Sequence, residues 1–411
     1  MSGTLASAAG GLRAELLAGI ERHRAEFEAA GDEAESLRTL PPSAVATVRS
    51  LGLFWLKTPA SLGGTPLAPL EFCDVIEELA YTDVSTAWAA MIGAGCCGLV
   101  GGWLPEAGAR RVFTPVAGAG GASAGTADAG LPVVAGQLAP RGTGTPVSGG
   151  YAVTGRWGFS SGILHADWLL GAFRTDAAAG DGAAADGGTG FGRMVVFAVP
   201  KSDAEVIDNW YVAGLQGTGS LDFRVDGLFV PEEMTYDLGI PAVRGGDLFR
   251  LGMPAFVSNE VPPLCVGLAR RALDDMSELA LHTTRFPGGP TVSDRAVFHK
   301  ELGRAETKLR AARLVHREAM ADCWESARSD GAPTEEQQLA VTAASVFAVE
   351  TAAEVVSDLF RYGGGRVLAL SSPMQRHLRN ALAARQHLAL SEEGYEAFGR
   401  YRLQSAKSRR S

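Results

Sequence analysis

The strongest restriction on the fold is a double change of residue pattern along the chain. Residues 11–113 repeat apolar side chains at helical spacing, with proline and glycine at expected helix starts and ends. From about 116 to 238, Gly, Thr and Ser separate short runs rich in Val, Phe, Trp and Tyr, which is typical of β-strands. From about 257 the helical period returns and persists. The sequence therefore predicts an α+β chain in the order helical, β, helical.

These changes predict three domains. We expect a helical domain at 1–115, a β-domain at 116–240 and a helical domain at 241–411. The stretch 176–190 is a low-complexity Ala/Gly/Asp loop between expected strands.

Charge and cysteine content exclude several classes of partner. The chain has 37 Lys and Arg against 46 Asp and Glu, and it lacks the basic surface of a nucleic-acid binder or a polybasic membrane anchor. The N-terminus has no basic region followed by an unbroken apolar stretch, so we expect no signal peptide. The five cysteines are odd in number and form no CxxC pair, which favours the cytoplasm.

One uncharged stretch, 84–105, is long enough to cross a membrane. It contains five glycines, and its flanks, Asp83 and Glu106, are acidic. We interpret it as a helix buried inside a helical bundle, because such helices are apolar all round. A transmembrane span is the alternative.

Common catalytic motifs are absent or lack their context. The glycines at 118–121 are not followed by a helix, and the GxSxG match at 121–125 lacks the strand–turn–helix of a nucleophile elbow. The seven histidines show no metal-ligand spacing, so we expect no metal.

Two segments are harder to explain as scaffold alone. At 154–162 an aromatic-rich strand ends in Ser160-Ser161-Gly162, which would place aromatic faces, a hydroxyl and backbone N–H groups against a flat ligand. At 217–222, GTGSLD would form a backbone nest close to a ligand. The alternatives are an ordinary strand with its turn and an ordinary loop.

With these segments, the sequence resembles the acyl-CoA dehydrogenase superfamily. The motifs are "GRWGFSSGILHADW", "GLQGTGSLDFRVDGLFVP", "LPPSAVATVRSLGLFWLKTPASLGG", "EELAYTDVSTAW" and "SSPMQRHLRNALAARQHLAL". They are most similar to the flavin-dependent monooxygenase branch, which includes phenol, p-hydroxyphenylacetate and steroid hydroxylases, dibenzothiophene monooxygenase and amino-sugar N-oxygenases. The resemblance implies a central β-barrel or sandwich, a C-terminal four-helix bundle and a homotetramer.

The resemblance also implies a flavin site. Trp157, Phe159 and Ser160 would lie beside the flavin, and the Ser161 hydroxyl close to its N5. Gln137 would touch the pyrimidine side of the ring. The remaining cofactor-binding positions are Arg285, expected at the phosphate of a neighbouring subunit's flavin, Gly364, in the loop closing that pocket, and Arg379.

The C-terminal motif separates two branches of the superfamily. Dehydrogenases commonly follow an Arg-Asp pair with a glutamate that abstracts the substrate's α-proton; here the pair is Arg379-Asn380, and the glutamate position is Leu388. The monooxygenase branch typically has a histidine here, which matches His387. Its hydrogen bond would hold a C4a-hydroperoxyflavin, and we expect it in the last turn of a helix, where the dipole favours a cation.

The resemblance therefore implies an oxygenase that uses O2 and reduced FMN or FAD from a separate NAD(P)H:flavin reductase. The substrate would be a small aromatic, polycyclic or amine compound, and we expect a role in secondary metabolism. Several phenol hydroxylases of this branch carry a histidine in the helix after "STAW"; this chain has Cys96 and Cys97, which we interpret as packing thiols. One alternative is a dehydrogenase with its base displaced to Glu260, and another is a flavin-free scaffold.

Overall fold

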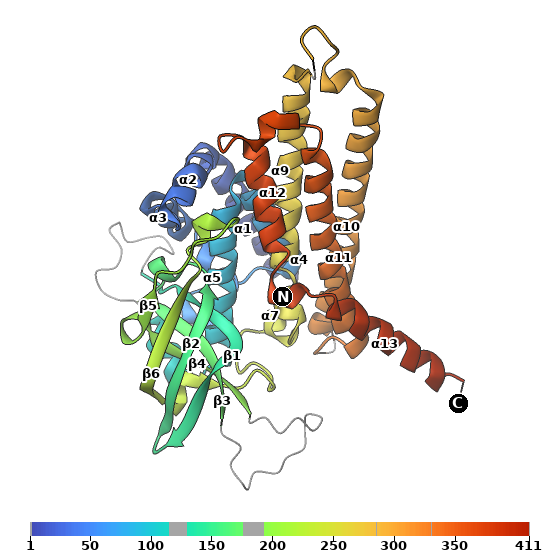
Figure 1. Cartoon of the computed structure of the whole chain (residues 1–411). Coiled ribbons are helices and arrows are strands. Elements are labelled where there is room, and N and C mark those ends of the chain that lie inside the picture. The colour runs from blue at the N-terminus through green and yellow to red at the C-terminus, as the bar shows by residue number, and fades with distance from the viewer. Residues whose placement is uncertain (1, 115–129, 176–192, 285, 330, 411) are drawn as a thin grey trace.

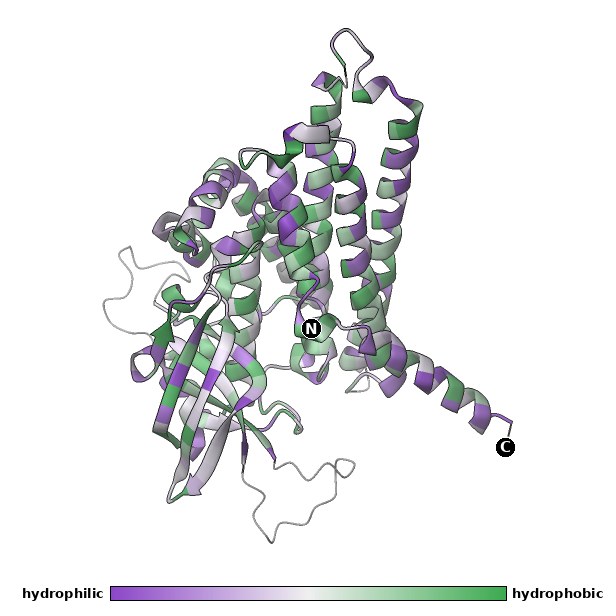
Figure 2. Cartoon of the chain, viewed as in Figure 1, coloured by the Kyte–Doolittle hydropathy of each residue, from purple (hydrophilic) through white to green (hydrophobic). Residues whose placement is uncertain are grey.

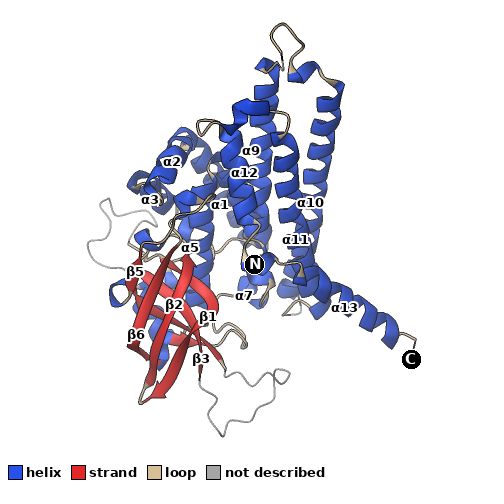
Figure 3. Cartoon of the chain, viewed as in Figure 1, coloured by secondary structure: helices blue, strands red, loops and turns tan. Residues whose placement is uncertain are grey.

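The computed structural model describes residues 2–114, 130–175, 193–284, 286–329 and 331–410. The glycine motifs at 118–125, the low-complexity loop at 176–190 and Arg285 lie outside this part of the chain. Within it, helices occupy both ends of the chain and strands its middle, as the sequence pattern predicts (Figures 1 and 3).

The N-terminal helices gather around α5. They are α1 (Ser2–Arg22), α2 (Arg24–Leu37), α3 (Pro42–Ser50), α4 (Pro69–Thr82), α5 (Val84–Trp103) and α6 (Glu106–Phe113). The Asp83 side chain caps α5 by accepting a hydrogen bond from the Thr86 N–H at 2.7 Å. The glycines of α5 allow close packing, because a Cβ on Gly93 would lie 2.6 Å from the Phe54 ring.

Two helices have the length and apolar composition of a membrane span, α5 and α11 (Glu335–Phe360). Most of each apolar window is buried inside the protein, and nearly all of α5 is. The uncharged stretch is thus a core helix in this structure, as its glycines predict.

The strands form one seven-stranded mixed sheet. They are β1 (Val134–Val147), β2 (Gly150–Ser160), β3 (Trp168–Thr175), β4 (Met194–Pro200), β5 (Glu205–Ile207), β6 (Leu221–Pro231) and β7 (Thr235–Tyr236), in the order β5-β6-β2-β1-β3-β4-β7. β1 pairs with β3 in parallel, and the other pairs are antiparallel.

Trp157 of β2 fills the centre of this sheet. Its ring stacks on Phe223 of β6 at 5.0 Å and meets Phe197 of β4 edge-on at 5.1 Å. Since β4 and β6 lie on opposite sides of β2 in the strand order, the sheet curls around the indole. Gly142 and Gly155 leave room for it, because a Cβ on either would lie within 3 Å of the ring.

The C-terminal helices form a bundle beside the sheet (Figure 1). They are the short α7 (Asp247–Arg250) and α8 (Ala255–Ser258), then α9 (Val261–His282), α10 (Ala296–Ser329), α11, α12 (Pro373–Ala384) and α13 (Glu393–Ser408). The long helices pack apolar faces against one another and turn polar faces outward (Figure 2). α13 extends away from the bundle.

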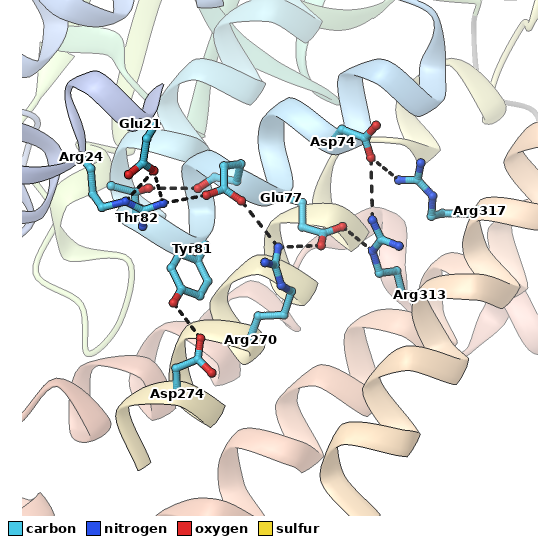
Figure 4. A network of polar contacts seen from close by, with 11 residues as sticks. Glu21, Arg24, Asp74, Glu77, Tyr81, Thr82, Arg270, Asp274, Arg313 and Arg317 are labelled. Carbon is cyan, nitrogen blue, oxygen red and sulfur yellow. Dashed lines mark hydrogen bonds and ion pairs between the residues drawn. The ribbon is translucent and has the colours of Figure 1, made fainter. Parts of the chain in front are cut away.

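Ion pairs tie α4 to the bundle (Figure 4). Glu77, buried on α4, accepts hydrogen bonds from Arg270 of α9 at 2.9 Å and from Arg313 of α10 at 2.7 Å. One turn earlier, Asp74 accepts from Arg317 of α10 at 2.8 Å. Each arginine delivers directional donors to a carboxylate, which fixes the angle between α4 and the bundle.

Candidate functional site

The candidate site lies where the end of β2 meets α5. The indole Nε1–H of Trp88, on α5, donates to the Ser161 hydroxyl at 2.9 Å. Both side chains are nearly enclosed, with 6% and 5% of their surface exposed. The sheet and the helical domain are therefore joined through the serine that the resemblance predicts beside a flavin.

Ser161 begins a chain of three hydroxyl groups. Its Oγ lies 2.7 Å from Ser220 Oγ, which lies 2.6 Å from Thr218 Oγ1. Thr218 Oγ1 in turn donates to the Leu215 carbonyl at 2.8 Å. All three hydroxyls are buried, so each depends on the others for its hydrogen bonds.

The loop that carries Ser220 is held by α12. The Asn380 side-chain oxygen accepts from the Leu215 N–H at 2.7 Å, and Arg379 donates to the Ala213 carbonyl. Arg379 also donates to Gln375 and, through Nη2, to both carboxylate oxygens of Glu35. The Arg379 guanidinium thus holds α12, α2 and the loop together, and its predicted contact with the cofactor stays a prediction.

The same loop is packed too closely to serve as an open backbone nest. A Cβ on Gly217 would lie 2.6 Å from Ala34 Cβ and 2.8 Å from Ser85 Oγ, so this glycine faces α2 and α5. The Thr218 carbonyl accepts from the Gly162 N–H at 2.9 Å. The segment at 217–222 thus supports the end of β2, and its contribution to the site is the two hydroxyls.

His387 lies on the other side of Trp88, with the two ring centroids 5.9 Å apart and edge to face. It follows α12 and precedes a short 3-10 turn, Leu388–Leu390, so the prediction of a place inside the last helical turn is wrong. The predicted cationic character is wrong as well. Burial lowers the pKa of the imidazole, which favours the neutral ring.

The hydrogen bonding of His387 indicates which nitrogen holds the proton. The Ala389 N–H donates to Nδ1 at 3.4 Å, so Nδ1 is the acceptor and Nε2 carries the hydrogen in the neutral ring. Among the described residues, Nε2 has no hydrogen-bond partner. His387 therefore retains one free neutral donor next to Trp88.

An exposed aromatic ring stands beside Ser161. Phe159 is 67% exposed, adopts the left-handed backbone conformation with φ of 60°, and meets Trp210 edge-on at 6.0 Å. A non-glycine residue there is uncommon, and the next residues turn back into the protein. The strand end thus presents one aromatic face to solvent above buried hydroxyls.

Two polar atoms on β1 and β2 have unfilled hydrogen-bonding capacity. Ser160 Oγ on β2 and Gln137 Oε1 on the neighbouring β1 are buried, and neither has a partner among the described residues. An exposed apolar face with polar groups at its border fits a flat heteroaromatic group, such as the flavin expected from the sequence. These two residues and Ser161 would meet its polar edge.

Trp157, also predicted beside the flavin, does not fit that prediction, because none of its surface is exposed. Its Nε1–H donates to the Ala172 carbonyl at 2.8 Å inside the curled sheet. It supports the strand that carries Phe159 and does not face the candidate flavin surface. Gly364 lies at the exposed start of a 3-10 turn, Gly364–Leu368, with φ of 63°; its place in a neighbour's flavin pocket stays a prediction.

Glu260 is buried against a lysine. Lys57, wholly buried, donates to a Glu260 carboxylate oxygen at 2.5 Å and to the Phe256 carbonyl at 2.7 Å. Burial raises the pKa of Glu260 and lowers the pKa of Lys57, while their mutual attraction opposes both shifts. A Cβ on Gly95 would lie 2.7 Å from the carboxylate, so α5 covers it.

The cysteines of α5 are packing residues, as predicted. Cys96 and Cys97 are free and buried, and burial raises the pKa of the Cys97 thiol to about 12. Within the described ranges, His, Cys, Asp and Glu form no group of three placed to hold a metal ion.

Comparison with known families agrees with this architecture. Residues 12–117 match the N-terminal domain of acyl-CoA dehydrogenase, and residues 262–392 match its C-terminal domain. Together the two matches cover more than half of the chain. This protein belongs to the acyl-CoA dehydrogenase superfamily. It follows that the sheet described above is the superfamily's central domain.

The similar proteins within this superfamily are oxygenases. An indole-3-acetate monooxygenase of Pseudomonas putida is 28% identical, over 89% of this chain and 88% of that protein. The oxygenase subunit HsaA, a flavin-dependent monooxygenase of Mycobacterium tuberculosis, is 26% identical over 94% of each chain. XiaF from a Streptomyces species, solved with FADH2 and glycerol, superimposes with a TM-score of 0.82 at 26% identity, over 96% of each chain. The chain is thus an oxidoreductase of the flavin-dependent monooxygenase branch.

Three residues of the candidate site were not singled out from the sequence. Trp88 ends the motif "EELAYTDVSTAW", and Thr218 and Ser220 lie in "GTGS", which suggested a backbone nest. An indole N–H and two hydroxyls carry no spacing signal of their own, because their partners come from distant strands and helices. Only the tertiary structure brings them to Ser161.

Proposed function

We propose that this chain is the oxygenase component of a two-component flavin-dependent monooxygenase. It would take reduced FMN or FAD from a separate NAD(P)H:flavin reductase. It would use O2 to hydroxylate, or N-oxygenate, a small aromatic, polycyclic or amine substrate, through the C4a-hydroperoxyflavin expected from the sequence. A role in secondary metabolism is part of the proposal. The oxygenase names of the relatives support it.

The observation that carries the proposal is the neutral donor at His387. Reduced flavin, when bound, supplies the electrons that activate O2. Beside it, the Nε2–H of His387 would donate a hydrogen bond that holds partly reduced oxygen in the site and slows its release as H2O2, without itself being a cation. Trp88 lies between the two residues: it would orient the His387 ring through the edge-to-face contact and Ser161 through the indole hydrogen bond. Phe159 would cover the flavin ring and limit access of water.

The dehydrogenase alternative lacks an available base. Leu388, at the expected glutamate position, is aliphatic and exposed, and the displaced candidate Glu260 is held by Lys57 beneath α5. A carboxylate in an ion pair with a buried lysine is a weak general base toward a substrate.

The proposal includes a homotetramer in the cytoplasm. Large apolar side chains remain exposed on the bundle, which supports a covered surface; they are Leu314, Val315, Phe347, Leu382 and Leu403. The buried, free state of all five cysteines is compatible with a reducing compartment.

The test mixes the anaerobic protein, loaded with one equivalent of photoreduced FMN or FAD, with oxygenated buffer, and follows flavin absorbance by stopped flow. We expect reoxidation slower than that of free flavin and divided into more than one phase. In parallel, oxidised flavin–protein complex is mixed with acyl-CoAs without O2, and we expect no bleaching. Reoxidation at the free-flavin rate, or bleaching by an acyl-CoA, would overturn the proposal.

A further inference from the structure

The hydroxyl chain at Ser161 has a direction, which its last contact determines. Thr218 Oγ1 lies 2.8 Å from the Leu215 carbonyl, and a carbonyl only accepts hydrogen bonds. If the Thr218 hydrogen pointed elsewhere, two oxygen atoms would face each other at this distance with no proton between them. The Thr218 hydrogen is therefore used by Leu215.

The donor in each of the other two hydrogen bonds then follows by exclusion. Thr218 and Ser220 are 2.6 Å apart, and the Thr218 hydrogen is already used, so Ser220 donates to Thr218. Ser220 and Ser161 are 2.7 Å apart, and the Ser220 hydrogen is used in turn, so Ser161 donates to Ser220. Each hydroxyl has one hydrogen, which leaves no second arrangement that fills all three contacts.

The Ser161 hydroxyl can therefore still accept a hydrogen bond but cannot donate one. Its hydrogen points to Ser220, and one of its two lone pairs accepts from the Trp88 N–H. One lone pair remains on its oxygen. Toward a ligand, Ser161 is an acceptor and has no hydrogen to donate.

We propose that Thr218 and Ser220 are positioning residues that make Ser161 select the redox state of the flavin. The inference rests on the proposed function and on the placement of the Ser161 hydroxyl close to flavin N5 that the resemblance implies. Reduced flavin carries a hydrogen on N5, which an acceptor satisfies, whereas oxidised flavin presents a lone pair there. Directed this way, Ser161 binds the reduced ring and meets the oxidised ring with two facing lone pairs.

The variant Thr218→Val removes the directing hydroxyl and little else. Valine has nearly the shape of threonine, and the Leu215 carbonyl keeps hydrogen bonds from the Thr218 N–H at 3.2 Å and from Trp210 Nε1 at 3.2 Å. Ser161 and Ser220 stay in place, but Ser220 no longer has an acceptor in Thr218. It is then free to donate to Ser161, whose hydrogen becomes available to oxidised N5.

Thr58→Val is the matched control. Thr58 is completely buried, and its hydroxyl has no partner among the described residues. The same substitution there removes a buried hydroxyl outside the chain of three. Thr218→Ser is the rescue variant, because it restores the directing hydroxyl.

The experiment measures the dissociation constants of oxidised and reduced flavin, by fluorescence titration in air and by anaerobic titration. We expect the wild-type protein to bind the reduced form more tightly than the oxidised form. Thr218→Val should lower the ratio of the oxidised-form to the reduced-form dissociation constant about tenfold, or about 1.4 kcal/mol. Since the ratio sets the potential, the two-electron reduction potential of the bound flavin falls by about 30 mV. Thr58→Val and Thr218→Ser keep the wild-type ratio.

Each outcome separates this inference from the proposed function. An unchanged ratio and potential in Thr218→Val overturns the inference, and so does a wild-type protein that binds both redox forms equally. If neither flavin binds in either state, the proposed function itself fails. If Thr218→Val does not fold, Ser220→Ala is measured instead; it removes the acceptor of Ser161 and should lower the ratio in the same direction.

Discussion

The Lys57–Glu260 pair and the Trp88–Ser161 pair both attach to α5, yet they differ in chemistry. The first is charged, and α5 covers its carboxylate. The second is neutral and leaves one acceptor on Ser161 and one donor on nearby His387. A strong buried charge pair therefore indicates how this protein is held together. The neutral groups around Trp88 lie at the site that we propose for the flavin.

Breaking the charged pair should have the largest effect on stability. Lys57→Met leaves the Glu260 carboxylate buried without its partner, and we expect a loss of about 3–5 kcal/mol in the free energy of unfolding. Urea unfolding measures it, and Lys57→Met/Glu260→Leu should regain much of the loss, because no charge is left unpaired. If Lys57→Met unfolds like the wild type yet loses flavin-dependent activity, the Lys57–Glu260 pair would have a catalytic role, and the contrast between the two pairs would be wrong.

A buried histidine outside the site should give a smaller, pH-dependent effect. Burial lowers the pKa of His316 to about 4, and its Nε2–H donates to the Ser258 carbonyl at 2.8 Å. The unfolded chain binds the proton below its ordinary pKa of about 6.5 while the folded chain does not, so stability falls as pH drops from about 6.5 toward 4.

Between pH 7 and pH 5 this should cost about 2 kcal/mol. His316→Gln keeps a donor but does not titrate, so its urea midpoint should fall less over the same range than that of the wild type. Equal pH slopes for the two proteins would show that His316 is not the responsible group.

Removing the indole donor should have the smallest effect, which flavin binding measures. Trp88→Phe deletes the hydrogen bond to Ser161 but leaves Thr218 to direct the hydroxyls. We expect both redox forms of the flavin to bind a few-fold to about tenfold more weakly, in line with one lost hydrogen bond, with their ratio unchanged. Flavin titration decides this, and a change in the ratio alone would assign the directing role to Trp88.

The sequence predicted the architecture well, because the periodicity of apolar residues reports burial directly. The helical nature of 84–103 and the strands between 134 and 236 follow from local patterns. The site was predicted through resemblance, and its flavin contacts stay predictions. The structure brings Ser161 and His387 to opposite sides of Trp88, whereas Trp157 is wholly buried in the sheet and Arg379 pairs with Glu35. Those two could not be placed from the sequence, since the neighbours that use them, Phe197 and Glu35, come from distant parts of the chain.

The neutral state of His387 was the opposite of the expectation from a helix dipole. Two facts change it: α12 ends at Ala384, and the ring is packed edge to face against Trp88. Burial then outweighs the weak attraction that a helix end offers to a cation. Neither fact is encoded in a motif.

The most direct test of the oxygenase role is the fate of O2 in variants of His387. Bound reduced flavin is mixed with O2, and flavin reoxidation and H2O2 release are followed together in the wild type, His387→Ala and His387→Gln. We expect His387→Ala to reoxidise and release H2O2 at least about tenfold faster, the loss of one hydrogen bond to oxygen, and His387→Gln, which keeps a neutral donor, to lie between. Identical traces for the three proteins, with flavin bound equally well, would contradict the role of His387.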